Sequence, residues 1–157
     1  MAEVSVERWQ ELYDRAFPQL YRALVAATLD RDRALDGLHD AFEEGIRHPP
    51  SDDRNLEGWL FRVALRKTRR GLLRTAREMV MRERGSGDLT LGVLNRVEVD
   101  ELLALLSERQ RSIVVAHYYL GLTQEEIAQS LGVRRGTVSA TVSQSLARMR
   151  KEGAEHA

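Results

Sequence analysis

The clearest local signal for the architecture of this chain lies in residues 123–147, which read TQEEIAQSLGVRRGTVSATVSQSLA. Thr123 is suited to cap the start of a helix, and Glu126 stands three residues later as its partner in a capping box. Gly132 is typical of the left-handed residue at which a helix ends. After a short turn, a second helix is expected over about 135–151. The spacing therefore predicts a helix-turn-helix.

Each helix of this motif has an apolar side and a side of small or polar residues. The residues that can pack the two helices at a steep angle are Ile127, Ala128, Leu131, Val133, Val138 and Val142. The outer face of the second helix carries Gly136, Thr137, Ala140, Ser143, Gln144 and Ala147. Such a face suits a DNA major groove, where Gln pairs with adenine and Ser or Thr with several base edges. The alternative is a packed helical hairpin with no role in DNA binding, which the capping box, the glycine corner and the small outer residues disfavour.

Apolar residues recur at helical spacing in nearly all of the remaining chain, so the predicted fold class is all-α. A first helical stretch over 9–28 contains Pro18, which should kink or divide it. A second helix follows and stops at His48, because a residue that precedes proline avoids the helical region. Asn55 is expected to cap a third helix, which continues past Arg74.

The second half of the chain restarts the helical pattern over 97–106. Ser107 and Gln110 form another capping box, before a helix that Gly121 should end. Residues 85–92, GSGDLTLG, hold three glycines and are the best candidate for a linker. We therefore expect two small helical domains, at 5–75 and 97–152, joined by a flexible linker at 76–96.

The composition excludes several classes of protein. The chain has 157 residues, with 24 Lys and Arg against 24 Asp and Glu, so a uniformly basic coat for nucleic acid is ruled out. It has no cysteine, which excludes disulfides, cysteine-ligated zinc and a cysteine nucleophile. No apolar run approaches the ~20 residues of a membrane span, and the N-terminus MAEVSVERWQ does not resemble a secretory signal. A soluble cytoplasmic protein is expected.

The sequence shows no constellation of residues for catalysis, for a metal ion or for a cofactor. The four histidines are scattered, and no third ligand joins Asp36 and Asp40, which share a helix face. Gly85 and Gly87 are not followed by the Lys-Ser or Lys-Thr of a phosphate-binding loop. We therefore expect no catalytic residue, no metal site, no cofactor and no enzymatic activity.

Charge is sorted along the chain. Residues 30–53 hold eight acids and three bases, whereas residues 54–84 hold ten bases and three acids. The plainer interpretation is a pair of solvated helix faces that attract each other. We favour a second interpretation, in which the acidic helix meets a basic protein partner and the basic helix meets phosphate.

The spacing of bases on the third helix favours this second interpretation. Arg62, Arg66 and Arg69 fall in one helical sector, opposite the apolar residues of the helix, and can neutralise several phosphates at once. Trp59 and Phe61 lie beside this sector, and aromatic rings next to arginine can stack on unpaired bases. Trp59 taken alone is more often a core residue.

Residues 102–150 resemble the promoter-binding fourth region of bacterial RNA polymerase sigma factors. The matching segments are Leu106 to Arg111, Tyr118 to Leu122, Glu126 to Ala128, Leu131 to Val133 and Gly136 to Val138. The first module resembles the second region of the same family. Its matching residues are Asp36, Leu38, Asp40 and Phe42 for the acidic polymerase-docking helix, and Trp59 to Ala64 for the promoter-melting helix. With only these two regions and a short linker, the chain resembles the extracytoplasmic-function (ECF) group of the sigma-70 family.

The resemblance implies a dissociable subunit that directs core RNA polymerase to specific promoters and aids DNA melting at initiation. The residues implied in binding the clamp of the largest polymerase subunits are Asp36, Leu38, His39, Asp40 and Phe42. Those implied at the downstream promoter element are Asn55, Trp59, Phe61, Arg62, Arg66, Lys67, Arg69 and Arg70. Those implied at the upstream element are Arg134, Arg135, Gly136, Thr137, Ser139, Ala140, Ser143, Gln144 and Arg148.

The resemblance also implies a role for the loop at 51–57, which would hold a base flipped out of the non-template strand. The linker would thread into the polymerase cleft. The implied partners are core RNA polymerase, promoter DNA both as duplex and as melted single strand, and an anti-sigma factor, with no insertion into a membrane.

Several positions depart from the family pattern. His39 stands where glutamine is usual, Arg66 where asparagine is common, and Gly37 where an apolar residue would help the helix. The recognition helix is unusually poor in charge, which predicts a weaker and less salt-sensitive upstream contact, although Arg134 and Arg135 at its start compensate in part.

The alternative function is a dimeric helix-turn-helix regulator that binds duplex DNA on its own at symmetric half-sites. A weaker alternative is an adaptor that binds polymerase without contacting DNA.

Overall fold

The computed structural model describes residues 5–78 and 95–155, and within them the side chains of residues 5–69 and 99–153. The described backbone forms helices and no strand, so the all-α prediction is confirmed. The helices are α1 (Val6–Thr28), α2 (Arg31–Arg47), α3 (Leu56–Glu78), α4 (Asn95–Ala104), α5 (Glu108–Tyr118), α6 (Gln124–Leu131) and α7 (Arg135–Glu155). None of these helices is both long and apolar enough to cross a membrane.

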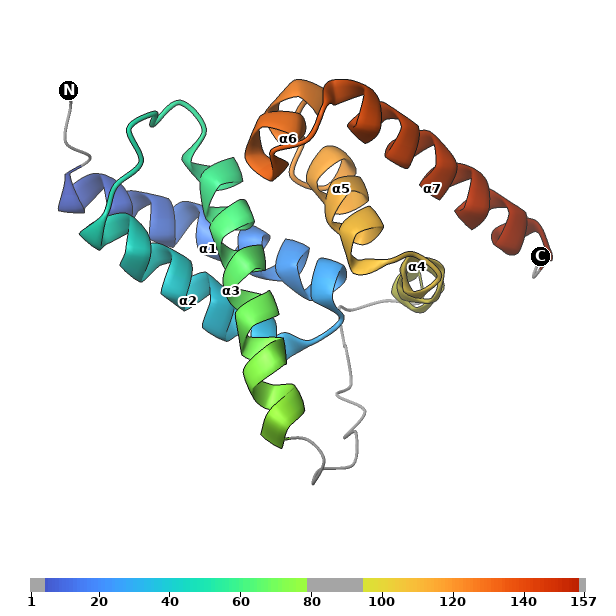
Figure 1. The fold of residues 1–157 in the computed structure, drawn as a ribbon, viewed down its shortest axis with the longest axis horizontal. Helices are drawn as coiled ribbons and strands as arrows, with labels where there is room; N and C mark the ends of the chain where they lie inside the picture. The colour runs from blue at the N-terminus through green and yellow to red at the C-terminus, as the bar shows by residue number, and fades with distance from the viewer. Residues whose placement is uncertain (1–4, 79–94, 156–157) are drawn as a thin grey trace.

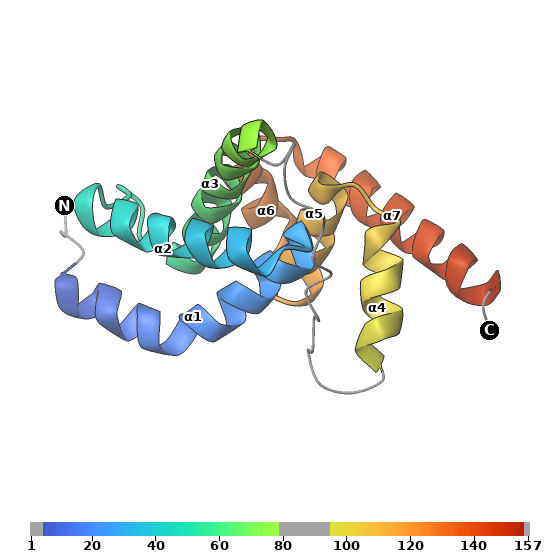
Figure 2. The same cartoon turned by 90° about the horizontal axis from the view of Figure 1, so that it is seen from below.

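The first three helices pack closely against one another (Figure 1). α2 lies against both α3 and α1, and buried leucine side chains fill the space between them. Leu20 and Leu24 of α1, Leu38 of α2 and Leu60 of α3 are almost fully buried. Pro18 lies inside α1 without dividing it, and Figure 2 shows that this helix is bent.

Two glycines on α2 allow it to approach its neighbours closely. A Cβ atom on Gly37 would lie 2.6 Å from Cγ2 of Thr68 and 2.9 Å from the carbonyl oxygen of Ala64, both on α3. A Cβ atom on Gly45 would overlap the ring of Trp9 on α1. The expectation that an apolar residue at position 37 would help the helix is therefore wrong, because any side chain there would overlap α3.

α4, α5 and α6 pack onto the first three helices, and α7 packs on α4, α5 and α6. α5 contacts α1, and α6 contacts the first part of α3, as Figure 1 shows. A single cluster of buried apolar side chains extends from α1, α2 and α3 into α5, α6 and α7. Arg111 of α5 donates hydrogen bonds to the carbonyl oxygens of Ala27 (2.8 Å) and Leu106 (2.6 Å). Burial lowers the pKa of the Arg111 guanidinium, which keeps its charge because arginine titrates far above neutral pH.

Short-range signals in the sequence predicted several helix ends correctly. The capping boxes of Ser107 with Gln110 and of Thr123 with Glu126 are both present. Gly132 follows α6 in the left-handed conformation, with a φ angle of 65°. Each of these signals acts within one helical turn, so the rest of the fold has little influence on them.

Other boundaries differ from the prediction. α5 ends at Tyr118, three residues before Gly121, which adopts a φ angle of 70°. α7 continues to Glu155 rather than ending near Lys151, since no proline or left-handed glycine stops it. The glycine-rich stretch 85–92 lies outside the described residues, and the linker and domain boundaries stay predictions.

The capping box of α6 offers a direct test of local stability. Glu126 donates its backbone N–H to Thr123 Oγ1, and Thr123 donates its own N–H to the Glu126 carboxylate, both at 3.1 Å. We expect Thr123→Ala to lower the free energy of unfolding by about 1 kcal/mol, because the N–H at the helix start loses its acceptor. Thr123→Ser keeps a hydroxyl and should stay close to wild type. Urea denaturation followed by circular dichroism measures both, and equal stability of the Ala variant and wild type would contradict the assignment.

Candidate nucleic-acid interface

A row of basic side chains runs along one face of α3. Arg66 and Arg69 are exposed, and Arg62 is partly exposed one turn earlier. The opposite face of the helix is buried and includes Leu60, Val63, Ala64 and Leu65. Since one helical turn advances about 5.4 Å, the three arginines present a spaced row of cations to one side. The side chain of Arg70 lies outside the described residues.

Glu44 of α2 meets this basic face from the neighbouring helix. Its Oε1 accepts a hydrogen bond from Nη2 of Arg66 at 2.9 Å, and its Oε2 lies 2.6 Å from Nζ of Lys67. Hydrogen bonding from Lys67 lowers the pKa of the Glu44 carboxyl below its usual value. One carboxylate therefore holds two adjacent cations of α3.

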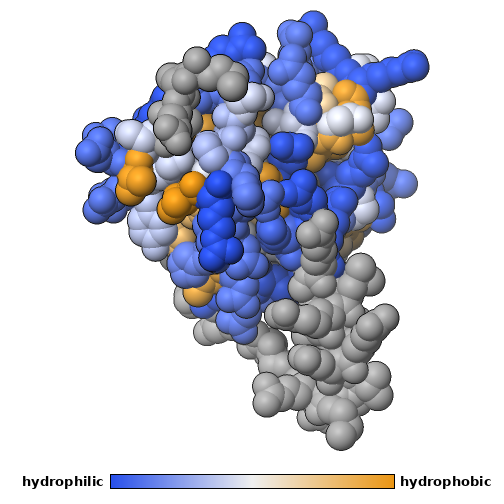
Figure 3. Space-filling model, turned by 60° about the vertical axis from the view of Figure 1, so that its left-hand side comes forward, coloured by the Kyte–Doolittle hydropathy of each residue, from blue (hydrophilic) through white to orange (hydrophobic). Residues whose placement is uncertain are grey.

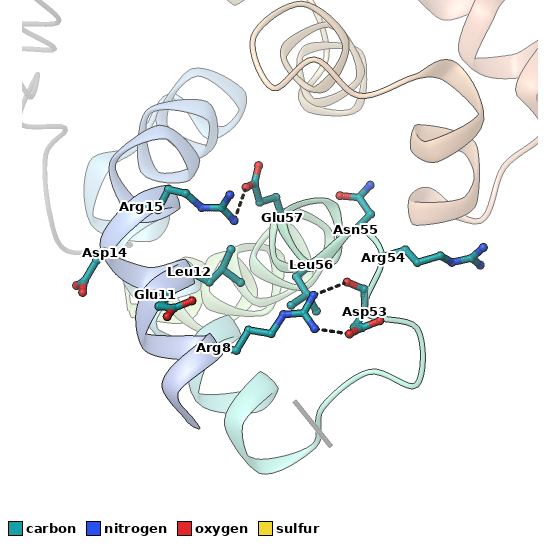
Figure 4. Close-up of a pocket in the computed structure, with 10 residues that line it drawn as sticks. All are labelled: Arg8, Glu11, Leu12, Asp14, Arg15, Asp53, Arg54, Asn55, Leu56 and Glu57. Carbon is teal, nitrogen blue, oxygen red and sulfur yellow. Dashed lines mark hydrogen bonds and ion pairs between the residues drawn. The ribbon is translucent and has the colours of Figure 1, made fainter. Parts of the chain in front are cut away.

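The loop between α2 and α3 borders a hollow of about 940 Å³ (Figure 4). That volume falls within the range of about 300–1,000 Å³ usual for ligand pockets. Its lining residues come from α1, from the loop and from the first turn of α3, and they are Arg8, Glu11, Leu12, Asp14, Arg15, Asp53, Arg54, Asn55, Leu56 and Glu57. The predicted base-holding segment 51–57 thus faces α1, and the wall is mostly charged.

Ion pairs hold this loop and the first turn of α3 against α1. Figure 4 shows the pairs of Arg8 with Asp53 and of Arg15 with Glu57 across the hollow. Arg54 pairs with Asp52 at 2.6 Å, and the hydrogen bond from its side chain lowers the pKa of Asp52 to about 2. Arg54 is otherwise exposed and points away from the hollow, where it can meet solvent or a phosphate.

Asn55 links the loop both to α3 and to α6. Its Oδ1 accepts a hydrogen bond from the N–H of Gly58 at 2.9 Å, so it caps α3 as predicted. Its Nδ2 donates to Oε2 of Glu126 at 2.8 Å, and Glu126 also completes the capping box of α6. Both ends of the amide are therefore engaged within the protein, which leaves only part of its hydrogen-bonding capacity for a contact with DNA.

The two aromatic residues beside the arginine row are not open stacking surfaces. Phe61 is 3% exposed and belongs to the core. Trp59 is partly buried, with its ring centroid 6.0 Å from that of Trp9 on α1. Phe61 therefore cannot stack on a base in this arrangement. Trp59 packs partly into the core, as expected for a large aromatic residue.

α6 and α7 form the predicted helix-turn-helix around Gly132. Its inner side buries Ile127, Ala128, Val138 and Val142. The exposed residues on the predicted DNA-facing side are Arg134, Arg135, Gly136, Thr137, Ala140, Ser143, Gln144, Ala147 and Arg148. Ser139 is only partly exposed. Small side chains on such a face allow the helix to approach a base edge closely.

The predicted docking residues on α2 divide between its surface and its core. Asp36, His39 and Asp40 are exposed, and the His39 ring stacks on Phe17 of α1 with centroids 5.3 Å apart. Leu38 is fully buried and Phe42 is 5% exposed, so both support the helix from beneath and neither is available to a partner. Figure 3, which turns forward the side on which α2 lies in Figure 1, shows small hydrophobic patches among hydrophilic side chains.

Sequence reasoning missed three groups that the fold brings to these surfaces. Glu44 was one acid in an acidic run, and only the packing of α2 on α3 brings it to Arg66. Arg8 and Arg15 of α1 are more than thirty residues from their partners, Asp53 in the loop and Glu57 in the first turn of α3. No local pattern marks such pairs, because the contact depends on how whole helices pack.

Comparison with known proteins identifies relatives for most of the chain. A family model described as sigma-70, region 4, matches residues 96–149. The chain is 28% identical over 148 residues to the ECF RNA polymerase sigma factor SigL of Mycobacterium tuberculosis, an alignment that covers 87% of this chain and 82% of that protein. It is 37% identical over 65 residues to the RNA polymerase sigma-E factor of Streptomyces coelicolor, covering 41% of this chain and 37% of that protein.

Two solved structures share the fold. The sigma factor RpoE from Bartonella quintana, in complex with the anti-sigma factor NepR, matches with a TM-score of 0.77 and 19% identity, covering 93% of this chain and 96% of RpoE. CnrH, in complex with the cytosolic domain of CnrY, matches with a TM-score of 0.72 and 21% identity, covering 98% of this chain and 92% of CnrH. At these identities the likeness concerns the fold.

Proposed function

We propose that this chain, a member of the ECF group of sigma-70 factors, directs core RNA polymerase to specific promoters and helps to melt them. The observation that carries the proposal is the order of three surfaces along the chain. An exposed acidic face on α2 comes first, the basic face of α3 follows, and the helix-turn-helix of α6 and α7 comes last. We further propose the domains 5–75 and 97–152, joined by a linker at 76–96, as the functional parts.

α2 is the proposed contact with polymerase. Asp36 and Asp40 project from one exposed face, and neither forms an ion pair with another of the described residues. Unpaired carboxylates on a helix are suited to a basic partner surface, which they would attract before contact and orient on contact. Exposed Leu35 and Ile46 on the same helix add apolar area. The proposed partner surface is the clamp of the largest polymerase subunits.

Promoter DNA is the proposed partner of the other two surfaces. The arginine row of α3, together with Lys67, would follow the backbone of the melted downstream element, and the hollow beside residues 51–57 would take a flipped base. α7 would enter the major groove of the upstream element. Gln144 can pair with adenine there, while Arg134, Arg135 and Arg148 meet phosphates.

Other properties follow from this role. Two solved structures with this fold are complexes, one of the sigma factor RpoE with the anti-sigma factor NepR and one of CnrH with the cytosolic domain of CnrY. We propose an anti-sigma factor as a partner of this chain as well. If the chain binds core RNA polymerase, it acts in the cytoplasm. It would then promote initiation by binding polymerase and promoter DNA, and it would catalyse no reaction itself.

Reconstituted transcription tests the proposal. We expect transcripts from defined start sites on genomic DNA only when the chain is added to core RNA polymerase. Gln144→Ala should reduce initiation at those promoters by about 5-fold or more, because one bidentate base contact contributes roughly 1–3 kcal/mol, while binding to core polymerase stays unchanged. Gln19→Ala, at an exposed position on α1, is the matched control and should initiate normally. Absence of specific initiation, with the chain binding duplex DNA alone as a dimer, would favour a regulator instead.

A further inference from the structure

Glu44 occupies two cations of the surface that we assign to promoter DNA. Of the arginine row on α3, the middle member, Arg66, is bonded to Glu44, and Lys67 beside it is bonded to the second oxygen of the same carboxylate. Arg62 and Arg69, on either side, form no ion pair with any carboxylate among the described residues. The carboxylate therefore divides the row into free and occupied cations.

A carboxylate bound in this way makes the same kind of contact as a phosphate. Both groups present two oxygen acceptors and a negative charge to Arg and Lys donors. The side chains of Glu44 and Lys67 are 26% and 24% exposed, so the group lies at the edge of the interface between α2 and α3 and is only partly screened by water. A DNA phosphate that approaches Arg66 or Lys67 meets cations whose charge Glu44 already offsets, and it must share their donors with that carboxylate.

We infer that Glu44 is a built-in competitor of the DNA backbone, which weakens the binding of single-stranded DNA to α3 in the free protein. The inference rests on the proposed function, because it assumes that α3 is a DNA surface. It adds that this chain restrains that surface from within, through a residue of the neighbouring helix. Removing the charge of Glu44 would return two cations to the row.

The affinity of the full-length chain for a fluorescently labelled single-stranded oligonucleotide of mixed sequence tests this inference. We expect Glu44→Gln to bind about five-fold more tightly near ~0.1 M salt for each cation that gains a phosphate, and to steepen the dependence of log K on log salt by about 0.7 for each. Fluorescence anisotropy over a potassium chloride series gives both quantities. A lower or unchanged affinity would show that Glu44 only positions its partners, and it would overturn the inference.

Glu43→Gln is the matched control. Glu43 precedes Glu44 on α2 and pairs with Arg47 of the same helix at 2.7 Å, away from α3. The substitution removes the same charge and should leave the affinity and the salt dependence close to wild type. An equal gain in both variants would attribute the effect to net charge and overturn the inference.

The first step of a second comparison needs no change at Glu44. With Glu44 intact, Arg66→Gln should weaken oligonucleotide binding less than Arg69→Gln, because Arg66 is already occupied. In the Glu44→Gln chain the two losses should become similar. Equal losses with Glu44 intact would contradict the inference even if Glu44→Gln failed to fold.

The same data separate this inference from the proposed function. If Arg69→Gln weakens DNA binding but Glu44→Gln does not strengthen it, the DNA surface on α3 stands and the role of Glu44 is wrong. If neither Arg62→Gln nor Arg69→Gln affects binding, α3 is not a DNA surface and both proposals fail there. Reconstituted transcription then decides whether the chain acts as a sigma factor without a DNA surface on α3.

Discussion

The double substitution Asp36→Arg and Asp40→Arg is expected to abolish stable binding of the chain to core RNA polymerase. Both carboxylates are exposed on one face of α2, so the substitution changes the surface without opening the core. It converts attraction for a basic partner into repulsion, and like charges that face each other across an interface cost several kcal/mol. We expect the affinity to fall by about 100-fold or more, measured by co-elution in gel filtration and by titration of labelled chain with core polymerase.

The matched control is Glu7→Arg with Glu11→Arg. These exposed glutamates have the same spacing of four residues, but they lie on α1. The control should bind polymerase as wild type does, and both variants should keep the thermal transition of wild type. Retained binding by the Asp36 and Asp40 variant would remove α2 as the docking surface.

Gly37→Ala is expected to destabilise the fold, although alanine is the better helix former. In an open helix the exchange would gain about 1 kcal/mol. Here the new Cβ atom would lie 2.9 Å from a backbone oxygen of Ala64, which cannot rotate away as a side chain can. Such overpacking costs about 1–3 kcal/mol and occasionally more, so after the gain in helix propensity we expect a net loss of up to about 2 kcal/mol. Chemical denaturation measures the change, and Gly37→Val should cost more.

Gly153→Ala provides the comparison at an open site. Gly153 lies near the end of α7, and a Cβ atom there would meet no atom within 4 Å. The same exchange should therefore be neutral or raise the free energy of unfolding by up to about 1 kcal/mol. If both glycine variants behaved alike, close packing of α2 on α3 would not explain Gly37.

What the sequence could predict depended on the range over which each signal acts. The caps at Ser107 and Thr123 and the left-handed Gly132 were predicted correctly, because their partners lie within one turn. The exposed side of α7 is the side of small and polar residues that the sequence predicted. An amphipathic helix buries its apolar stripe wherever it packs, so its outer face can be predicted from spacing. These features define the helix-turn-helix without knowledge of the rest of the chain.

Features set by packing between helices could not be predicted. A motif match cannot tell whether Leu38, Phe42 and Phe61 face a partner or the core, and all three are buried. Gly37 looked unfavourable because the sequence does not show how closely α3 approaches. The bond of Glu44 to Arg66 likewise needs the relative positions of two helices. Domain boundaries and DNA contacts of individual residues stay predictions.

The contact between Asn55 and Glu126 has a consequence for how this protein can evolve. One glutamate closes the first helix of the helix-turn-helix with one oxygen and holds the loop before α3 with the other. A substitution at either residue therefore affects both the loop and the start of α6. The changes in the free energy of unfolding that two such substitutions cause need not add. A substitution that alters DNA recognition by the helix-turn-helix would therefore have to preserve the position of the loop before α3, and the reverse also holds. This hydrogen bond thus gives a physical route by which substitutions in two distant parts of the chain would be coupled.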